Sequence, residues 1–167
     1  MEKWSVSDCD VVISYMMLPQ DANPSGNVHG GVIMKHIDSA AGVVALRHAR
    51  SNVVTASIDR LDFHHPVFIG NLLTLQARIN WVGQTSMEIE VRAEAEDPMS
   101  GEVRHVASAF LTFVALDADG RPASVPPLSL ETPDALRRHK EALARRRLRL
   151  AEKEKARQCR ADIERCE

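Results

Sequence analysis

The sequence predicts an α+β protein in which an antiparallel sheet is wrapped around one helix. Residues 30–48 repeat apolar side chains at helical spacing, whereas four later segments have the alternation or the apolar density of strands. Most of those segments follow one another through short turns, which favours antiparallel pairing with the helix on one face of the sheet.

The first elements are a strand at residues 11–17, a loop at 19–26 rich in Pro, Asn and Gly, and then the helix. Ile33, Ile37, Ala40, Ala41 and Val44 form one narrow stripe of mostly small residues on this helix. Such a stripe is typical of a helix that lies close against a sheet.

Residues 53–64 predict a strand that bends. Its apolar side chains change parity between Ile58 and Leu61, which indicates a bulge near residues 59–60. Segments 73–81 and 87–95 alternate cleanly around a hairpin at 83–85, and segment 103–116 is apolar on both parities, as in a strand covered on both faces. A homodimer is the simplest expected source of cover for the outer face of the sheet.

A basic helix is predicted after residue 131, with Thr132 as N-cap, Pro133 at the first helical position and Asp134 in the first turn. We therefore divide the chain into a folded domain at 1–130 and a charged C-terminal helix or tail at 131–167. Two interpretations of this helix stay open. It is either a solvated helix held by intermingled glutamates, or an element that binds phosphate or bridges subunits.

Composition excludes several classes of function. A net charge of -2 over 167 residues gives no reason to expect a nucleic-acid partner. No apolar run approaches the length of about 20 residues that a membrane-spanning helix needs, and the first residues do not open a signal peptide, so we expect a cytoplasmic protein without a membrane partner. Cys9, Cys159 and Cys166 are odd in number and far apart, which disfavours a disulfide framework.

Known catalytic motifs are also absent from the sequence. It contains no Gly-x-Ser-x-Gly elbow, no phosphate-binding or dinucleotide-binding glycine pattern and no His-x-x-x-His pair, so we expect no metal. His36 and His48 lie on or beside the buried stripe of the helix, and we interpret them as satisfied core histidines.

One constellation does predict chemistry. His29, Gly30 and Gly31 open the helix, where backbone N–H groups can stabilise an oxyanion. Asp38 follows about two turns further along at the flank of the apolar stripe, where a carboxylate can act as a general base. Together they favour acyl transfer to water. Asn23 is a second candidate polar group, with a turn residue before a proline as the alternative.

Specific motifs surround these residues. Segment 23–31 reads Asn-Pro-Ser-Gly-Asn-Val-His-Gly-Gly, and it is followed by Met-Lys-His-Ile-Asp at 34–38, Ala-Gly at 41–42 and Arg-His at 47–48. This run resembles the hotdog-fold acyl-coenzyme A thioesterases of the cytosolic acyl-CoA hydrolase type, including the short single-domain bacterial members. The resemblance covers about residues 5 to 140, with further matching segments at 54–59, 62–64, 86–91, 107–114 and 126–128.

The resemblance implies a five-stranded antiparallel sheet curled around the helix and hydrolysis of acyl-CoA to a free fatty acid and coenzyme A, without a further cofactor. It also implies a homodimer with a continuous sheet, commonly assembled as a trimer of dimers, a hexamer. The family's catalytic asparagine and acid fall on Asn23 and Asp38, given by different chains to one site.

Within this implied reaction, we expect the thioester carbonyl to accept a hydrogen bond from the N–H near Gly31 at the helix start. Asp38 would activate water or, as an alternative, attack directly. Arg60, Arg92 and Ser86 are our candidates for binding the phosphates of coenzyme A. Two other functions stay open, a hotdog dehydratase using His29 or His36 and a non-catalytic acyl-CoA-binding regulatory module.

Overall fold

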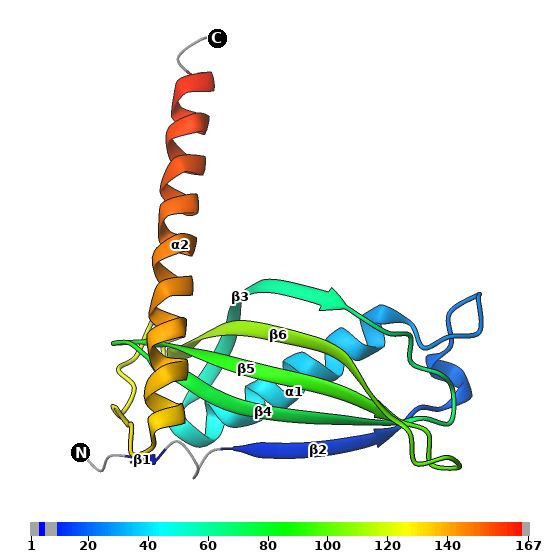
Figure 1. Ribbon diagram of the computed structural model, residues 1–167. Coiled ribbons are helices and arrows are strands. Elements are labelled where there is room, and N and C mark those ends of the chain that lie inside the picture. The colour runs from blue at the N-terminus through cyan, green and yellow to red at the C-terminus, as the bar shows by residue number, and fades with distance from the viewer. Residues whose placement is uncertain (1–3, 6–9, 165–167) are drawn as a thin grey trace.

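The computed structural model describes residues 4–5 and 10–164, with the backbone alone at residues 4–5, 60 and 160–164. Five strands form an antiparallel sheet in the order β2-β4-β5-β6-β3, which curves around helix α1 (Figure 1). The elements are β2 (Val11–Met16), α1 (Gly30–Ala49), β3 (Asn52–Phe63), β4 (Leu72–Val82), β5 (Ser86–Glu96), β6 (Val103–Leu116) and α2 (Pro133–Glu164). The predicted fold class is confirmed.

Three shorter elements complete this arrangement. A 3-10 turn, η2 (Pro19–Asp21), precedes α1, and β1 (Trp4–Ser5) pairs in parallel with β7 (Leu128–Ser129). Among the described residues, no helix is both long enough and apolar enough to cross a membrane. Cys159 is a free, exposed thiol, whereas Cys9 and Cys166 lie outside the described residues.

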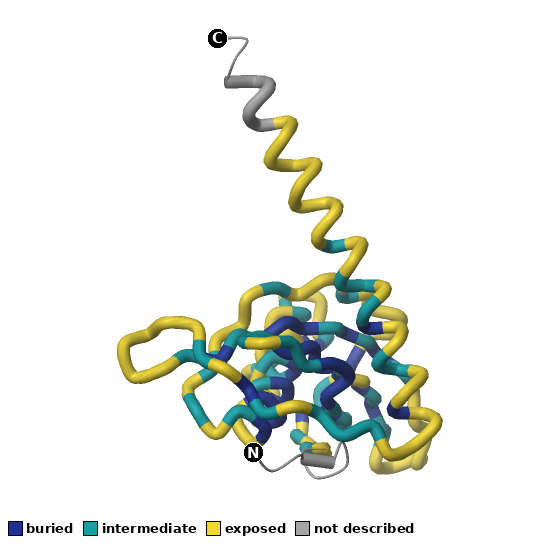
Figure 2. The backbone as a smooth tube through the Cα atoms, turned by 90° about the vertical axis from the view of Figure 1, so that its left-hand side faces the viewer, coloured by how far each residue is buried: buried dark blue, intermediate teal, exposed yellow. Residues whose placement is uncertain are grey.

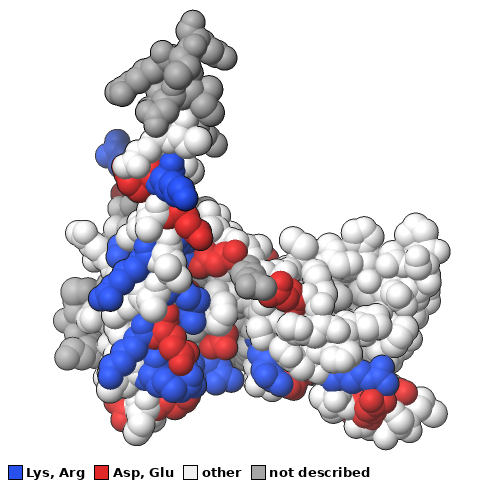
Figure 3. All heavy atoms as spheres, turned by 45° about the horizontal axis from the view of Figure 1, so that its top comes forward, with Lys and Arg blue, Asp and Glu red and all other residues white. Residues whose placement is uncertain are grey.

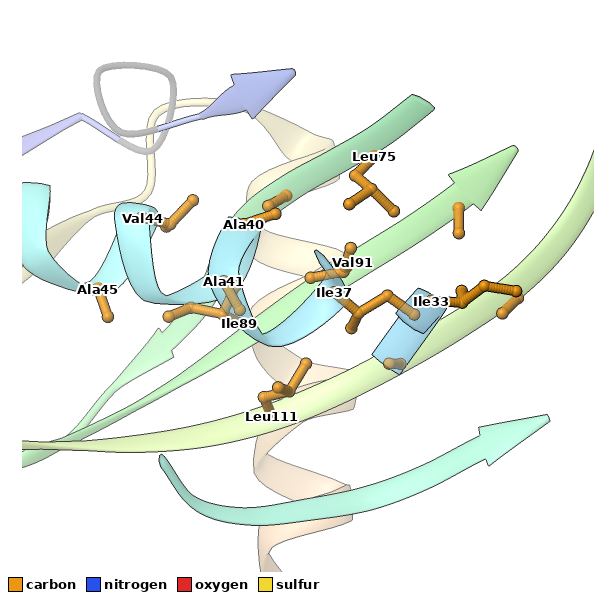
Figure 4. Packing of buried hydrophobic residues seen from close by; sticks show 14 of the residues in the cluster. Ile33, Ile37, Ala40, Ala41, Val44, Ala45, Leu75, Ile89, Val91 and Leu111 are labelled. Carbon is orange, nitrogen blue, oxygen red and sulfur yellow. The ribbon is translucent and has the colours of Figure 1, made fainter. Parts of the chain in front are cut away.

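The core lies between α1 and the inner face of the sheet. Ala40, Ala41, Val44 and Ala45 are completely buried, and their small side chains let the helix approach the strands closely (Figure 4). Alternate residues of the three central strands meet this stripe, among them Leu75, Ile89, Val91 and Leu111. The predicted stripe on α1 is therefore the buried one.

Strand β3 carries the predicted bulge and a second one. Its register against β6 shifts between Ile58 and Leu61, where the parity change was found, and also between Thr55 and Ser57. A bulge increases local twist and bends a strand. The two bulges together let this edge strand curl around α1.

Helix α2 begins as the sequence predicts and then packs on the outer face of the sheet. The Thr132 hydroxyl accepts a hydrogen bond from the Ala135 N–H at 3.1 Å. Ala135 and Ala142 are buried against the body. The outer face is thus covered in part by the same chain, a source of cover that the sequence analysis did not consider.

Arginines of α2 also contact the body of the protein. Arg145 forms an ion pair with the buried Glu88 of β5 at 2.7 Å, and its guanidinium also lies 3.8 Å from the ring centroid of Phe110. Arg146 lies over the ring of Trp81. The interpretation of α2 as a solvated helix is therefore wrong for its first half, residues 133–149, one face of which packs on the body. It is correct for residues 151–159, which are exposed where the helix leaves the body (Figure 2).

His48 is a core histidine, as expected. It is fully buried near the end of α1, and its Nε2 donates to the Pro126 carbonyl at 2.9 Å. Burial lowers the pKa of His48 below its usual value of 6.5. His36 differs from the expectation because it is only half-buried, with its ring stacked on Tyr15.

The buried imidazole predicts a loss of stability in acid. Because folding lowers the pKa of His48, its contribution is present above pH 6.5 and is lost as the pH falls through the folded-state value. His48→Gln keeps a donor for Pro126 and is expected to flatten the dependence of unfolding free energy on pH, by at most about 1.4 kcal/mol per pH unit. Urea unfolding between pH 7 and pH 5 measures this, and parallel curves for the two proteins would contradict it.

Candidate functional site

The loop before α1 fixes Asn23 through its backbone and its side chain. Asn23 Oδ1 accepts the N–H groups of Ser25 at 2.9 Å and Asn27 at 3.2 Å, and the Asn23 N–H donates to the Asn27 carbonyl at 2.6 Å. Gly26 completes the turn with a φ of 84°. Asn23 is therefore a turn residue, and among the described residues nothing accepts from its Nδ2.

The first turn of α1 is capped by its own histidine. His29 is the N-cap, and its Nδ1 accepts from the Gly31 N–H at 2.9 Å. A Cβ at Gly31 would lie 3.1 Å from that same nitrogen, which is tighter than ordinary contact, so glycine gives the imidazole room to cap. The Gly31 N–H is thus aimed out of the helix as expected, but it is occupied by His29 rather than bare.

Asp38 is half-buried on α1 and is held by a hydroxyl from the sheet. The Thr55 Oγ1 donates to Asp38 Oδ1 at 2.7 Å from the inner side of β3. Thr55 received no role from the sequence, although it lies within one of the matching segments. The signal available was a hydroxyl side chain, one of two, in the strand expected to bend around the helix.

A cleft of about 330 Å³ brings Asn23 and Gly30 together. Its other lining residues are Asn27, Val28, Ile33, Phe63, His64, His65, Pro66 and Val67. Asp38 is not among them, because eight residues of α1 after Gly30 correspond to about 12 Å along the helix axis. One chain therefore holds these residues in two separate groups, Asn23 with the start of α1 and Asp38 with Thr55.

Ser86 and Arg92, two of the three candidate phosphate ligands, lie apart within one chain. Ser86 begins β5, and Arg92 lies six residues further on, a separation of about 20 Å along a strand. Arg92 is exposed and forms an ion pair with Glu94 at 2.8 Å. The side chain of Arg60 lies outside the described residues.

A second, larger cleft lies on the outer face of the sheet. It encloses about 510 Å³ between α2 and strands β3 and β6, with Arg145, Arg149 and Phe110 among its lining residues. Cationic side chains gather over α2 on this side, with acidic side chains between them (Figure 3). No group of His, Cys, Asp and Glu within the described part of the chain could hold a metal ion.

Comparison with known proteins identifies similar sequences. Residues 25–102 match the Thioesterase superfamily. An acyl-CoA thioester hydrolase of Bacillus subtilis, itself described as uncharacterized, is 39% identical over 135 residues, which cover 81% of this chain and 78% of that protein. The human cytosolic acyl coenzyme A thioester hydrolase is 41% identical over 144 residues, and this chain spans only 38% of its length. The rat and mouse enzymes of that name are likewise matched over 38% of their length.

Solved structures give the same picture. An apo-hexameric acyl-CoA thioesterase has a TM-score of 0.87 and 34% identity, over 91% of this chain and 97% of that one. An acyl-CoA hydrolase of Staphylococcus aureus, in complex with butyryl coenzyme A, coenzyme A and coenzyme A disulfide, has a TM-score of 0.85 and 32% identity, over 94% of this chain and 96% of that one. Variants of that hydrolase with one aspartate, one asparagine or one threonine replaced by alanine have also been solved.

Proposed function

Because this chain belongs to the thioesterase superfamily and, within it, to the acyl-CoA thioester hydrolases, we propose that it cleaves acyl-CoA to a free fatty acid and coenzyme A. The observation that carries this proposal is the half-buried carboxylate of Asp38, held by the Thr55 hydroxyl on the inner side of the sheet. A carboxylate fixed in this way is suited to take a proton from water.

The spacing of three residues supports the assignment. In the Staphylococcus aureus hydrolase, the substituted asparagine precedes the substituted aspartate by fifteen residues, and the substituted threonine follows that aspartate by seventeen. Asn23, Asp38 and Thr55 have these same two spacings. We therefore assign Asp38 as the general base, Thr55 as its positioning residue and Asn23 as the group that orients water or the thioester carbonyl.

The reaction adds water across the C–S bond. Asp38 removes a proton while the water oxygen attacks the thioester carbon, and the carbonyl oxygen becomes an oxyanion that accepts from the Gly31 N–H. His29 Nδ1 now holds this N–H, so the substrate oxygen would replace it as acceptor. Collapse of the intermediate breaks the C–S bond, and the thiolate of coenzyme A takes up a proton. Direct attack by Asp38 remains the alternative first step.

We propose that a complete site forms between subunits. Within one chain, Asn23 lines a cleft that does not include Asp38, so each residue would supply half of a site. The surface beside them exposes apolar side chains, as a subunit interface would. These side chains are Met34, Val43 and Leu46 on α1 and Val54, Ile58 and Phe63 on β3. A homodimer that assembles further to a hexamer, as a trimer of dimers, would pair Asn23 of one chain with Asp38 of the other.

Other parts of the proposal follow from the substrate. The reaction needs no cofactor beyond the coenzyme A that the substrate carries. Arg60, Ser86 and Arg92 stay candidates for the phosphates of coenzyme A, and since Ser86 and Arg92 are far apart in one chain, they would serve different parts of the ligand or different sites. A cytoplasmic location also stays a prediction.

A panel of acyl-CoA esters tests the function directly. Release of a free thiol, detected with a disulfide reagent, is the result expected of a hydrolase, and the panel also measures the preferred acyl length. A change in enoyl absorbance without thiol release would instead identify a dehydratase. Tight binding with neither signal would identify a regulatory module.

Removing the hydroxyl that holds Asp38 is expected to slow the reaction. Thr55→Val deletes the hydrogen bond to Asp38 with little change in volume, and we expect kcat to fall about tenfold because the base loses its orientation. Thr55→Ser keeps the hydroxyl and should recover most of the rate. Steady-state kinetics on one acyl-CoA measure both, and equal rates for the valine and serine variants would remove Thr55 from the mechanism.

A further inference from the structure

An ion pair joins the far end of the packed part of α2 to strand β3. The Arg149 Nη1 forms an ion pair with Asp59 Oδ2, and these side chains are only 14% and 17% exposed. Just before it, α2 and the sheet are separated by the outer cleft of about 510 Å³, and Leu148 is 66% exposed. This ion pair therefore helps to hold the helix against β3 at a point where the exposed Leu148 adds little apolar packing.

Asp59 lies in the most irregular part of β3. The register against β6 shifts on both sides of the Ser57–Ile58 pair of residues, so this part of the strand has fewer regular ladder contacts than the rest. The second carboxylate oxygen, Asp59 Oδ1, accepts from the Ser57 hydroxyl at 3.2 Å. Asp59 thus links Ser57 on one side to Arg149 on the other.

The same strand carries Thr55, the residue that positions the base of the proposed reaction, Asp38 of α1. Thr55 lies two residues before Ser57, across the first bulge, and its hydroxyl donates to Asp38. Regions with fewer buried contacts and fewer ladder hydrogen bonds open locally at a lower free-energy cost than the rest of a fold. Whatever fixes residues 57–59 therefore also limits the movement of Thr55.

We propose that Arg149 is a positioning residue that acts from α2, through Asp59 and the bulged part of β3, on the hydrogen bond between Thr55 and Asp38. This inference rests on the proposed hydrolysis. The sequence left open whether the basic helix is solvated or instead binds phosphate or bridges subunits. In this proposal the helix contributes to catalysis without touching substrate. Arg149 and Thr55 lie on opposite faces of the sheet, and β3 transmits the effect between them.

Arg149→Ala tests the link, with Arg149→Lys as rescue and Arg137→Ala as matched control. Arg137 is also an α2 arginine with ion pairs, but its partners Asp134 and Glu141 lie on the same helix. We expect Arg149→Ala to lower kcat about tenfold with KM changed less than about twofold, since ground-state binding is untouched. A lysine can replace the single Nη1 contact, so Arg149→Lys should stay within about threefold of the wild type.

Amide hydrogen exchange provides a readout independent of catalysis. Peptides spanning residues 53–61 should exchange about tenfold faster in Arg149→Ala than in the wild type or in Arg137→Ala, while peptides from β4 should be unchanged. Asp59→Asn should reproduce both effects if a variant at 149 does not fold. Unchanged exchange in β3, or a rise in KM with kcat unchanged, would overturn the inference. If the wild type released no thiol, the hydrolase proposal would fail while the exchange data still tested the link.

Discussion

Asp38→Ala is expected to lower kcat by about a thousandfold, because it removes the carboxylate that we propose takes the proton from water. Coenzyme A should bind nearly as well as before, since the side chain acts on the attacking water and not on the nucleotide. Asp38→Asn should be equally slow although it keeps an acceptor for the Thr55 hydroxyl, because a neutral amide is not a base at neutral pH. Kinetics on one acyl-CoA, with calorimetric titration of coenzyme A, separate the two effects.

Ser39→Ala is the matched control for this experiment. Ser39 is the next residue on α1, it is exposed, and its hydroxyl donates to the Lys35 carbonyl one turn earlier. Its loss should leave kcat within about twofold of the wild type, as for an exposed helix residue outside the site. Turnover by Asp38→Ala at the rate of this control would remove the carboxylate from the mechanism.

Arg145→Ala is expected to produce the largest loss of stability, about 3 kcal/mol at neutral to alkaline pH, because it leaves a buried charge without its partner. Glu88 is fully buried on the outer side of β5, and its Oε1 accepts from Arg145 Nε at 3.2 Å and from Nη2 at 2.7 Å. Its other oxygen has no hydrogen-bond partner within the described part of the chain. Removal of the guanidinium also exposes one face of the Phe110 ring.

The pH dependence of this loss has a definite sign. Burial raises the pKa of Glu88 above its usual value of 4.5, and the hydrogen bond and charge of Arg145 oppose that rise. A carboxyl group with a raised folded-state pKa contributes stability below pH 4.5, and this contribution is lost as the pH rises through the folded-state value. Without Arg145 the pKa of Glu88 is higher still, so the deficit of Arg145→Ala should be small in acid and widen as the pH rises.

Urea unfolding at pH 5 and pH 8, at one fixed protein concentration, measures this deficit. Arg137→Ala breaks only exposed ion pairs within α2 and should change the unfolding free energy by less than about 1 kcal/mol. Adding Glu88→Gln to Arg145→Ala should recover part of the lost stability, because the buried charge is then absent. A deficit that is the same at both pH values would show that lost packing on Phe110, and not the unpaired carboxylate, causes it.

Periodicity predicted the strands of the sheet because one face of the sheet is buried against α1, which gives each strand a regular pattern of apolar residues. Strands β4 and β5 each bury about one side chain in two against α1, so burial alternates as the sequence does. The expectation that segment 103–116 is covered on both faces is met only in part, because Ser108 and Phe110 of β6 are half-buried and line the outer cleft. The bulge near residues 59–60 was visible because apolar parity changes there. The bulge at Thr55 was not visible, because no parity change separates Val54, Ala56 and Ile58.

The candidate site was predicted less completely. Asn23, Gly31 and Asp38 were proposed from their residue types, their positions and the family resemblance, and these assignments stay predictions, but the contacts that hold the three residues were not predicted. His29 capping the Gly31 N–H is a local contact that depends on one side-chain rotamer. The hydrogen bond between Thr55 and Asp38 joins residues seventeen apart in the sequence, and no pattern on either segment indicates it.

The sequence by itself determined the order and type of the elements, the buried stripe of α1 and the position of a carboxylate beyond a glycine-opened helix start. These depend on which residues recur at which spacing along the chain. Only the tertiary structure decided that the Thr55 hydroxyl holds Asp38 and that arginines of α2 are tied to Glu88 and Asp59. An ion pair between a helix and a sheet depends on where both elements pack. An exposed helix and a packed helix can carry the same charged residues, so composition does not distinguish them.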